Sequence, residues 1–317
     1  MPDIRVGKSS SGNVRGSFLT FKSAEEIRSN VTLDQQRKIV QMYKKLAEQA
    51  KRQAEALKGK DNVSSILREQ YLNRLVEQLI NASEGISDSI ESTIKSNMKT
   101  VSEGVVQDQR DFLELVGMPG FESAFSHVPT QIVQTVANGD LYTGDWTLSK
   151  AIWSSSKKVS DDINRIVAEG IAANKSSYDI AKDLEKYVNP SAVKPWDWGK
   201  VYPGTNKVVD YNAQRLARTM VSHAYQQSIV NTCRPNPFVT GIKWVASNSA
   251  RTCELCKQRD GTVYPKDDVP LDHPNGICTY VAVIPNMSDV ADRIADWYDG
   301  NPDPALDKFA EYLYRKF

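Results

Sequence analysis

Apolar residues recur every three or four positions through the first third of the chain, which is the period of an amphipathic helix. The first such stretch follows Thr32, a residue type that favours helix N-caps, and Gly59 is its expected end. A second pattern runs up to the turn at residues 117–120, and Gly85 and Gly104 inside it predict a kinked or split helix. The apolar positions are Ile39, Tyr43, Leu46, Ala50, Ala54 and Leu57 in the first helix, and Leu72, Val76, Leu79, Ile86, Ile90, Ile94, Val101 and Val105 in the second. Such helices bury a narrow stripe against each other or against a neighbouring subunit.

The second half of the chain alternates shorter helical patterns with loops and includes segments of β character. Helices are predicted over residues 152–171, 177–184, 212–232, 288–298 and 304–317, with a proline-rich loop over residues 189–205. Short strands are predicted over residues 241–246, 261–264 and 279–284. Five of the six tryptophans lie beyond residue 150, as expected of a compact core. The predicted fold class is therefore mainly α with a small β-hairpin region (α+β).

Composition predicts four consecutive regions. Residues 1–31 are rich in Ser and Gly and lack periodicity, which predicts a flexible N-terminal arm. Residues 32–145 form a helical assembly arm, and the boundary lies near residue 145 because tryptophan content rises after it. Residues 146–287 form a domain that contains the hairpin, and residues 288–317 form C-terminal helices.

The net charge excludes a general affinity of the whole molecule for polyanions and leaves a local DNA contact open. The 317-residue chain has a formal net charge of +1, so the whole molecule is not a surface for polyanions. Residues 37–60 are nevertheless basic, which is typical either of a DNA contact or of an ordinary solvated face. The basic residues of the predicted helix include Arg37, Lys38, Lys44, Lys45, Lys51 and Arg52. The sequence lacks an apolar run long enough to cross a bilayer and an N-terminal secretory pattern, which predicts a protein made and kept in a cytosol-like compartment.

Three cysteines and a histidine in the C-terminal half form a pattern typical of metal ligands: Cys253, Cys256, His273 and Cys278. The C-x-x-C spacing lets two thiolates bind one ion from a tight turn, and in a reducing compartment it indicates metal ligation before disulfides. Four ligands of this type fill the tetrahedron of zinc and leave no open position for water. The pattern therefore predicts a structural Zn²⁺ site that holds together a small β-hairpin.

The pattern has two alternatives to a zinc site. In the first, the four residues are unrelated buried thiols and a loop histidine. In the second, the C-x-x-C is a redox pair. A thioredoxin-like pair opens a helix after a strand, whereas polar residues 247–252 lead into this one. Cys233 is interpreted as a small buried apolar residue, and Arg218, His223 and His127 are interpreted as structural.

Short motifs in the second half occur in a characteristic order. The segment Arg215–Val221 (RLARTMV) is followed by Lys243–Ala246 (KWVA), then by the C-x-x-C with Asp260–Tyr264 (DGTVY), and then by His273–Asn275 (HPN). Over about residues 150–285 the chain thus resembles the phage head morphogenesis family, also called Mu F-like minor capsid proteins. In that family a helix with an A-R-T-E-V-like core precedes a Trp-containing strand, C-x-x-C, a D-G turn and an H-P-x-C-R-C ending.

The chain departs from the family pattern at three positions. Met220 stands where an acidic residue is usual, Gly276 replaces the first cysteine after His-Pro, and Ile277 stands where Arg is common. Only Cys278 is left as the fourth ligand at this end of the motif.

The resemblance implies a non-enzymatic structural protein of a tailed bacteriophage, made in the host cytoplasm and located in the virion near the portal vertex or inside the capsid, in several copies. Its implied partners are portal, scaffold and other capsid proteins, with packaged DNA as a further partner of the basic helix. The alternative is a zinc-dependent nuclease or other hydrolase with one ligand displaced, for which Asp260 and Asp272 are candidate general bases. A third hypothesis is a zinc ribbon that reads DNA, but the cysteines lack a neighbouring basic cluster.

Overall fold

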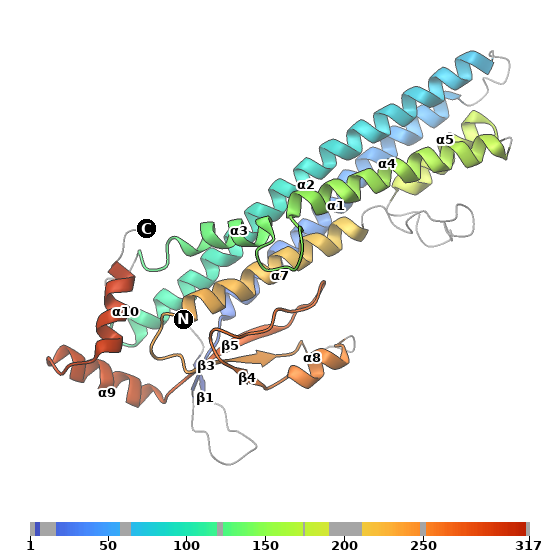
Figure 1. The fold of residues 1–317 in the computed structure, drawn as a ribbon. Coiled ribbons are helices and arrows are strands. Elements are labelled where there is room, and N and C mark those ends of the chain that lie inside the picture. Colours follow the sequence, from blue (N-terminus) through green and yellow to red (C-terminus); the bar gives the residue numbers. More distant parts are fainter. Residues whose placement is uncertain are drawn as a thin grey trace. The chain divides into compact units, whose positions relative to one another are not determined.

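The protein is mainly helical, with one small antiparallel sheet (Figure 1), which confirms the predicted fold class at this level. The computed structural model describes residues 4–6, 17–57, 65–118, 123–173, 175–189, 211–247 and 252–314. The helices are α1 Lys22–Leu57, α2 Ser65–Leu115, α3 Val128–Asn138, α4 Leu148–Ala172, α5 Ser177–Val188, α7 Tyr211–Cys233, α8 Glu254–Arg259, α9 Met287–Tyr298 and α10 Pro304–Tyr314. The strands are β1 Ile4–Val6, β2 Ser17–Leu19, β3 Gly241–Val245, β4 Val263–Tyr264 and β5 Thr279–Ile284. The loop predicted over residues 189–205 lies, beyond its first residue, outside the described residues.

The chain divides into two compact units, each assembled from segments that are distant in the sequence. Unit 1 contains Met1–Thr32, Lys95–Val136 and Arg218–Phe317, and unit 2 contains Leu33–Ile94 and Ala137–Ala217. Each unit thus combines segments from both sides of residue 145, where composition predicts a boundary. The boundary predicted from composition reflects where tryptophans concentrate, whereas the bounds of the compact units depend on which helix segments pack together.

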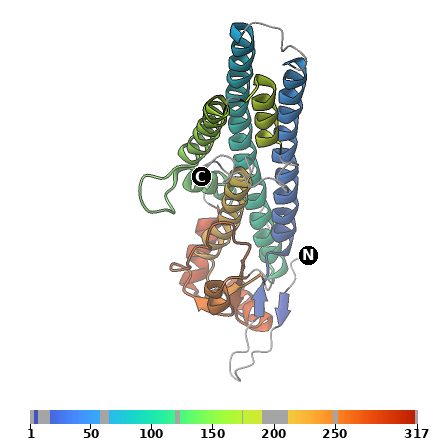
Figure 2. The same ribbon diagram turned by 90° about the vertical axis from the view of Figure 1, so that its right-hand side faces the viewer.

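Unit 2 consists of helices that bury the stripes expected from the apolar periodicity. Its segments of α1 and α2 lie side by side (Figures 1 and 2). The buried positions include Ile39, Tyr43, Leu46, Ala50 and Ala54 on α1, and Leu72, Leu79, Ile90 and Ile94 on α2. Helix α5 packs closely on α4, because a Cβ added at Gly170 would lie 2.7 Å from Cγ1 of Ile180. The hydroxyl of Tyr187 on α5 also donates to the buried Asp162 on α4, at 3.0 Å.

The start of α1 corrects the prediction of an N-cap at Thr32. The helix begins at Lys22, ten residues earlier. The backbone N–H of Ala24 donates to Oδ2 of Asp108 on α2 at 3.0 Å, so a carboxylate from another helix satisfies one of the free N–H groups in the first turn. Local N-cap preference therefore misplaced the helix start, because the acceptor lies 84 residues away in the sequence.

Helix α2 is continuous over 51 residues, so it is not split at its glycines. Gly104 has a packing role instead. A Cβ at this position would lie 2.8 Å from Cδ1 of Ile27 and 3.2 Å from Cα of Ala24, which means that glycine permits the close approach of α1 to α2 in unit 1.

The sheet of unit 1 has five antiparallel strands in the order β1-β2-β5-β3-β4. Strands β1 and β2 and the first turns of α1 come from residues predicted as a flexible arm, and this prediction is wrong for the part of the arm that the structure describes. Strand β2 pairs with β5, with Phe18 opposite Val283. Trp244 on β3 is fully buried against Tyr280 on β5, whereas Trp153 in unit 2 is 65% exposed, so the tryptophans do not all mark a core. Among the described residues, every helix is too short or too polar to cross a membrane.

Candidate metal centre

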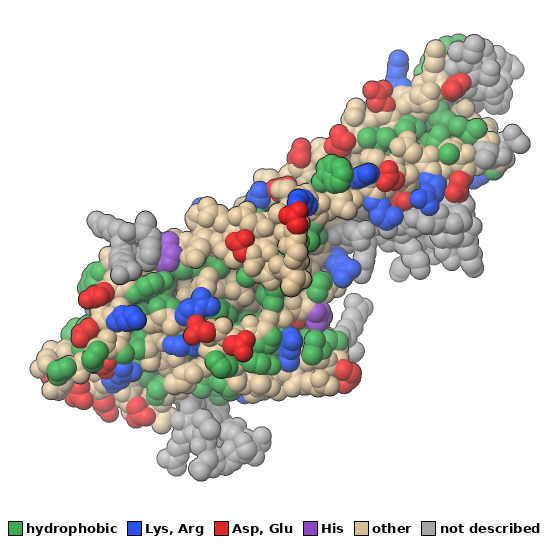
Figure 3. Space-filling model, viewed as in Figure 1, with side chains coloured by type: hydrophobic (Ala, Val, Ile, Leu, Met, Phe, Trp, Pro, Cys, Tyr) green, Lys and Arg blue, Asp and Glu red, His purple; other side chains and the backbone are tan. Residues whose placement is uncertain are grey.

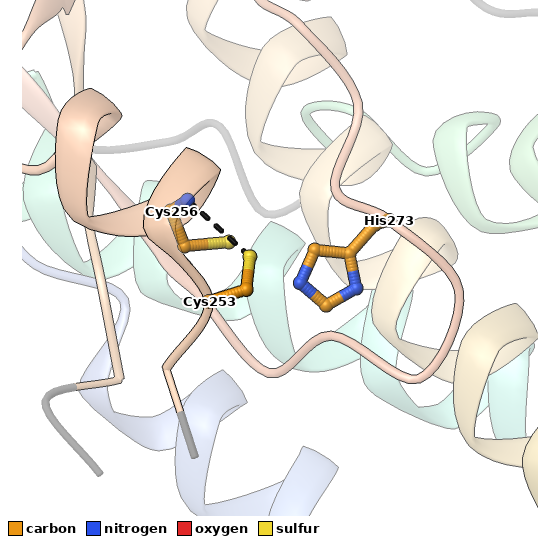
Figure 4. A group of neighbouring side chains, drawn as sticks. All are labelled: Cys253, Cys256 and His273. Atoms are coloured by element: carbon orange, nitrogen blue, oxygen red, sulfur yellow. Dashed lines mark hydrogen bonds between the residues drawn. The ribbon is translucent and has the colours of Figure 1, made fainter. Parts of the chain in front are cut away.

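The four predicted ligands come from two neighbouring segments of unit 1. Cys253 and Cys256 lie at the start of α8, in the connection between β3 and β4, and Cys278 directly precedes β5. His273 lies in the loop between β4 and β5. Figure 4 shows the imidazole ring of His273 facing the sulfurs of Cys253 and Cys256.

Two overlapping groups of side chains in this region are able to hold a metal ion. Ligand atoms of Cys253, Cys256 and His273 lie within 4.8 Å of one another, and so do those of Cys256, Asp272 and Cys278. The structure thus brings the predicted ligands together around the shared Cys256, although not all four in one group. Asp272 is the addition that the cysteine and histidine spacing did not predict.

The C-x-x-C segment forms a turn that stabilises one thiolate. Cys253 is the N-cap of α8, with φ −74° and ψ 161°, and its Sγ accepts the backbone N–H of Cys256 at 3.5 Å. This hydrogen bond lowers the pKa of Cys253. The two cysteines therefore do open a short helix after a strand, as in a thioredoxin-like pair and contrary to the expectation from the polar residues that precede them.

Burial raises the pKa of the two other thiols, whereas the hydrogen bond lowers that of Cys253. Cys256 and Cys278 are almost completely buried, and desolvation raises the pKa of each. Each of these thiols also lies near the carboxylate of Asp272, which disfavours a second negative charge. A cation bound between the sulfurs would offset this cost, because thiolates are the form in which cysteines bind metals.

His273 presents one ring nitrogen to the cluster. Its Nδ1 lies 3.0 Å from the carbonyl oxygen of Pro274, and this hydrogen bond is the main cause that raises the pKa of the imidazole. With Nδ1–H donating to a carbonyl, Nε2 is the atom left to act as a ligand. Metal-binding histidines are commonly oriented by a backbone carbonyl in this way.

Asp272 organises the loop that carries His273 and Cys278. Its carboxylate is fully buried, and it accepts the N–H of His273 at 2.8 Å through Oδ1 and the N–H of Cys278 at 3.1 Å through Oδ2. Oδ1 also lies 3.7 Å from Sγ of Cys256. The carboxylate occupies the space beside Gly276, where an added Cβ would lie 2.1 Å from Oδ2. The only sequence feature that indicates this role of Asp272 is its position directly before the His-Pro pair.

Helix α7 holds this loop through one face. Arg218 donates to Oδ1 of Asn275 at 2.6 Å, and the N–H of Asn275 donates to Oγ1 of Thr219 at 2.8 Å. Further along α7, Nε2 of His223 lies 3.1 Å from the carbonyl oxygen of Asp272. The interpretation of Arg218 as structural agrees with its contact with Asn275, and His223 is a buried contact of the β4–β5 loop.

Helix α1 holds the same loop from the N-terminal end of the chain. Arg28, of which only 6% is exposed, donates to the carbonyl oxygens of Cys278 at 3.0 Å and Ile277 at 3.2 Å. Its guanidinium also lies over the ring of Tyr225, 4.4 Å from the centroid. Sequence patterns did not identify Arg28, because its partners are about 250 residues away.

The other candidate residues have structural roles within unit 1. Oδ1 of Asp260 accepts the N–H of Ala246 at 2.8 Å, which ties the ends of the β3–β4 connection together. Cys233 is fully buried as predicted, and burial raises its pKa to about 12. His127 lies 3.3 Å from the hydroxyl of Tyr312 on α10.

Comparisons of the chain with protein-family models, with curated protein sequences and with solved structures find no match.

Proposed function

We propose that Cys253, Cys256, His273 and Cys278 bind one structural Zn²⁺, and that the protein is a non-enzymatic minor head protein of a tailed bacteriophage. The observation that carries this proposal is that Cys253, Cys256 and His273 form one group of ligand atoms, and that Cys256 shares a second group with Cys278. His273 and Cys278 lie on a loop that the Arg-Thr segment of α7 anchors.

The donor set fits zinc better than a hard cation. Three thiolates and an imidazole are soft and borderline ligands, which favour Zn²⁺ over Mg²⁺ or Ca²⁺. The two oxygens of Asp272 already accept backbone N–H groups, so this residue supports the loop rather than completing the coordination sphere. The sheet strand β4 is only two residues long, and an ion between α8 and the β4–β5 loop would add the cohesion that so short a strand lacks.

A structural role is favoured over zinc-dependent hydrolysis. Four protein ligands leave no position for the water that a catalytic zinc activates. Of the two candidate general bases, Asp260 is engaged by the N–H of Ala246, and Asp272 is engaged by two backbone N–H groups. Both carboxylates thus already have structural hydrogen-bonding roles.

The phage role is supported by the way the family-like motifs meet. Arg218 and Thr219 of the A-R-T segment contact Asn275 of the H-P-N segment, although these residues are more than 50 positions apart. Two motifs that define the resemblance thus form one interaction. From the resemblance follow the proposed location in the virion, near the portal vertex or inside the capsid, and the proposed partners among portal, scaffold and capsid proteins.

Metal analysis tests the zinc site. We expect one zinc per purified chain by inductively coupled plasma mass spectrometry, and loss of most of it in Cys278→Ser. Cys233→Ser is the matched control, since Cys233 is a buried thiol outside the cluster. Full zinc content in Cys278→Ser would contradict the proposed ligand set.

Two further assays test the role. Cleavage of plasmid or single-stranded DNA in the presence of Zn²⁺, Mg²⁺ or Mn²⁺ would favour the nuclease, whereas a structural protein leaves the DNA intact. Mass spectrometry of virions and empty heads from a phage whose genome encodes the chain tests the location. Peptides of the chain are expected in these particles, and their absence from both would refute a head protein.

A further inference from the structure

Helix α1 carries two parallel columns of basic side chains in unit 2. Residues 37, 44 and 51 form one column and residues 38, 45 and 52 the other, each with a spacing of seven residues. All six side chains are exposed: Arg37, Lys38, Lys44, Lys45, Lys51 and Arg52. Seven residues of α-helix rise about 10.5 Å, so the positive charges repeat at that interval along one face. Among the described residues, only Arg37 of this set forms an ion pair, with Asp34 at 3.2 Å.

Helix α2 carries an acidic column with the same spacing. Glu77, Glu84 and Glu91 are again seven residues apart, and Asp88 lies one turn from both Glu84 and Glu91. The negative charges therefore repeat at the same interval of about 10.5 Å. Figure 3 shows acidic side chains following one another along the edge where Figure 1 draws α2.

The acidic column borders a groove between α2 and α4. The groove has a volume of about 660 Å³, and its lining contains Glu84, Asp88 and Glu91 against a single basic residue, Lys157. Trp153 on α4 lines the same groove and is 65% exposed. An exposed tryptophan beside charged groups is typical of an anchor in a protein interface.

The basic columns and the acidic groove lie on different sides of unit 2. Figure 2 shows α1 and α4 on opposite sides of α2 in this unit. The buried positions of α1, such as Tyr43 and Leu46, fix which of its faces points outward. One chain therefore does not place its own basic columns in its own groove.

We propose that a second copy of this chain lays the exposed face of its α1 along the acidic column and groove of α2 and α4. Equal spacing lets successive lysines and arginines meet successive carboxylates, as charged positions do across coiled coils. Trp153 packs on the aliphatic stems of the incoming basic side chains. Because the two surfaces differ, the contact is head-to-tail and builds a ring or a filament. This surface is independent of the metal centre.

DNA is the rival partner for the basic columns. A duplex would neutralise the lysines and arginines of α1, but it would leave the acidic column and Trp153 unused. A second copy uses both surfaces at once, so the observations favour self-association.

Charge reversal with mixing tests the proposal on the full-length protein by sedimentation velocity. The acidic column is reversed by Glu77→Lys, Glu84→Lys and Glu91→Lys, and one basic column by Lys38→Glu, Lys45→Glu and Arg52→Glu. Each variant alone is expected to associate about 10- to 100-fold more weakly than the wild type, because each exposed pair contributes only a fraction of a kcal/mol and several are reversed. Mixing the two variants restores association, since each then supplies the surface that the other lacks. Trp153→Ala weakens association without changing its dependence on salt.

The controls separate this interface from a general effect of charge. Asp292→Lys, Asp296→Lys and Asp299→Lys change the same number of exposed acidic residues on α9 and at its C-cap, outside both surfaces, and are expected to leave association unchanged. Wild-type association is expected to weaken between 0.05 and 0.5 M NaCl, because salt screens exposed charges. A wild-type protein that stays monomeric, or a mixture that stays dissociated, overturns the proposal. So does a basic-column variant that loses duplex DNA binding while self-association is unchanged.

Discussion

Gly276 is predicted to be intolerant of even one added methyl group. Its backbone φ lies outside the positive range that requires glycine, so Gly276→Ala introduces no backbone strain. The added Cβ would, however, lie 2.1 Å from Oδ2, 2.3 Å from Cγ and 2.5 Å from Oδ1 of Asp272. Normal contacts begin beyond 3 Å, so the carboxylate or the loop must move by about 1 Å or more.

The loss of folding free energy follows from the hydrogen bonds that the carboxylate of Asp272 accepts. Asp272 is fully buried and accepts the N–H groups of His273 and Cys278. A hydrogen bond to a charged group contributes about 1.5–3 kcal/mol, and losing both bonds costs about 3–6 kcal/mol. The same displacement moves two of the proposed zinc ligands, so Gly276→Ala is also expected to weaken zinc binding.

Urea unfolding of the zinc-loaded protein, followed by circular dichroism, measures the effect, and competition with a chromophoric chelator measures zinc affinity. Gly85→Ala is the matched control, because no heavy atom lies within 4 Å of its added Cβ in the middle of α2. That substitution is expected to stabilise the protein by about 0.5–1 kcal/mol through helix propensity. The two alanines therefore have opposite predicted signs.

A double-mutant cycle isolates the clash. In an Asp272→Ser background the carboxylate is gone, and Gly276→Ala should cost much less than in the wild type. If Gly276→Ala leaves stability and zinc affinity at wild-type values, the carboxylate does not organise the loop, and the reasoning is refuted.

Three further substitutions test contacts within a single unit. Asp108→Ala should lower the free energy of unfolding by about 1–3 kcal/mol because the N–H of Ala24 loses a buried acceptor, whereas Asp108→Asn keeps an oxygen there and should cost less in urea titrations. Burial raises the pKa of Asp108 above 3.8, so the part of the folding stability that depends on its protonation is full below that pH and is lost as pH rises through the folded-state pKa. A pH series of melting temperatures should show this step in the wild type and not in Asp108→Asn. Tyr187→Phe should cost about 1–3 kcal/mol by removing the donor to buried Asp162, and an unchanged melting temperature would contradict that contact. Arg28→Met keeps the volume but removes both donors to the β4–β5 loop, and it should destabilise by about 2–4 kcal/mol, as measured against Arg37→Met on the exposed face.

Periodicity predicted much of the helical structure because a helix is stabilised mainly by contacts three and four residues apart. The buried faces around Ile39, Tyr43 and Leu79 follow directly from that local pattern. The candidate ligands were predicted from spacing, because a C-x-x-C turn is local and its His and Cys partners lie within one connection of the sheet. The structure places Cys253, Cys256 and His273 in one group and Cys278 in a second group that shares Cys256. Asp272 was predicted only as a candidate general base. Its place beside the candidate ligands was not predicted, because aspartate is common in loops and only the burial of its carboxylate marks it.

By itself, the sequence determined most of the long helices, the apolar face of each, and the cysteines and histidine that are candidate ligands, but it did not predict α3 or α8. Only the tertiary structure decided where α1 begins, that β2 pairs with β5 and β1 with β2, and that Arg28 binds the β4–β5 loop. The physical reason is that each of these features depends on a hydrogen-bond partner far away in the chain. A local sequence pattern reflects interactions between residues that are close in the chain, whereas the partner of a buried donor depends on how distant segments pack.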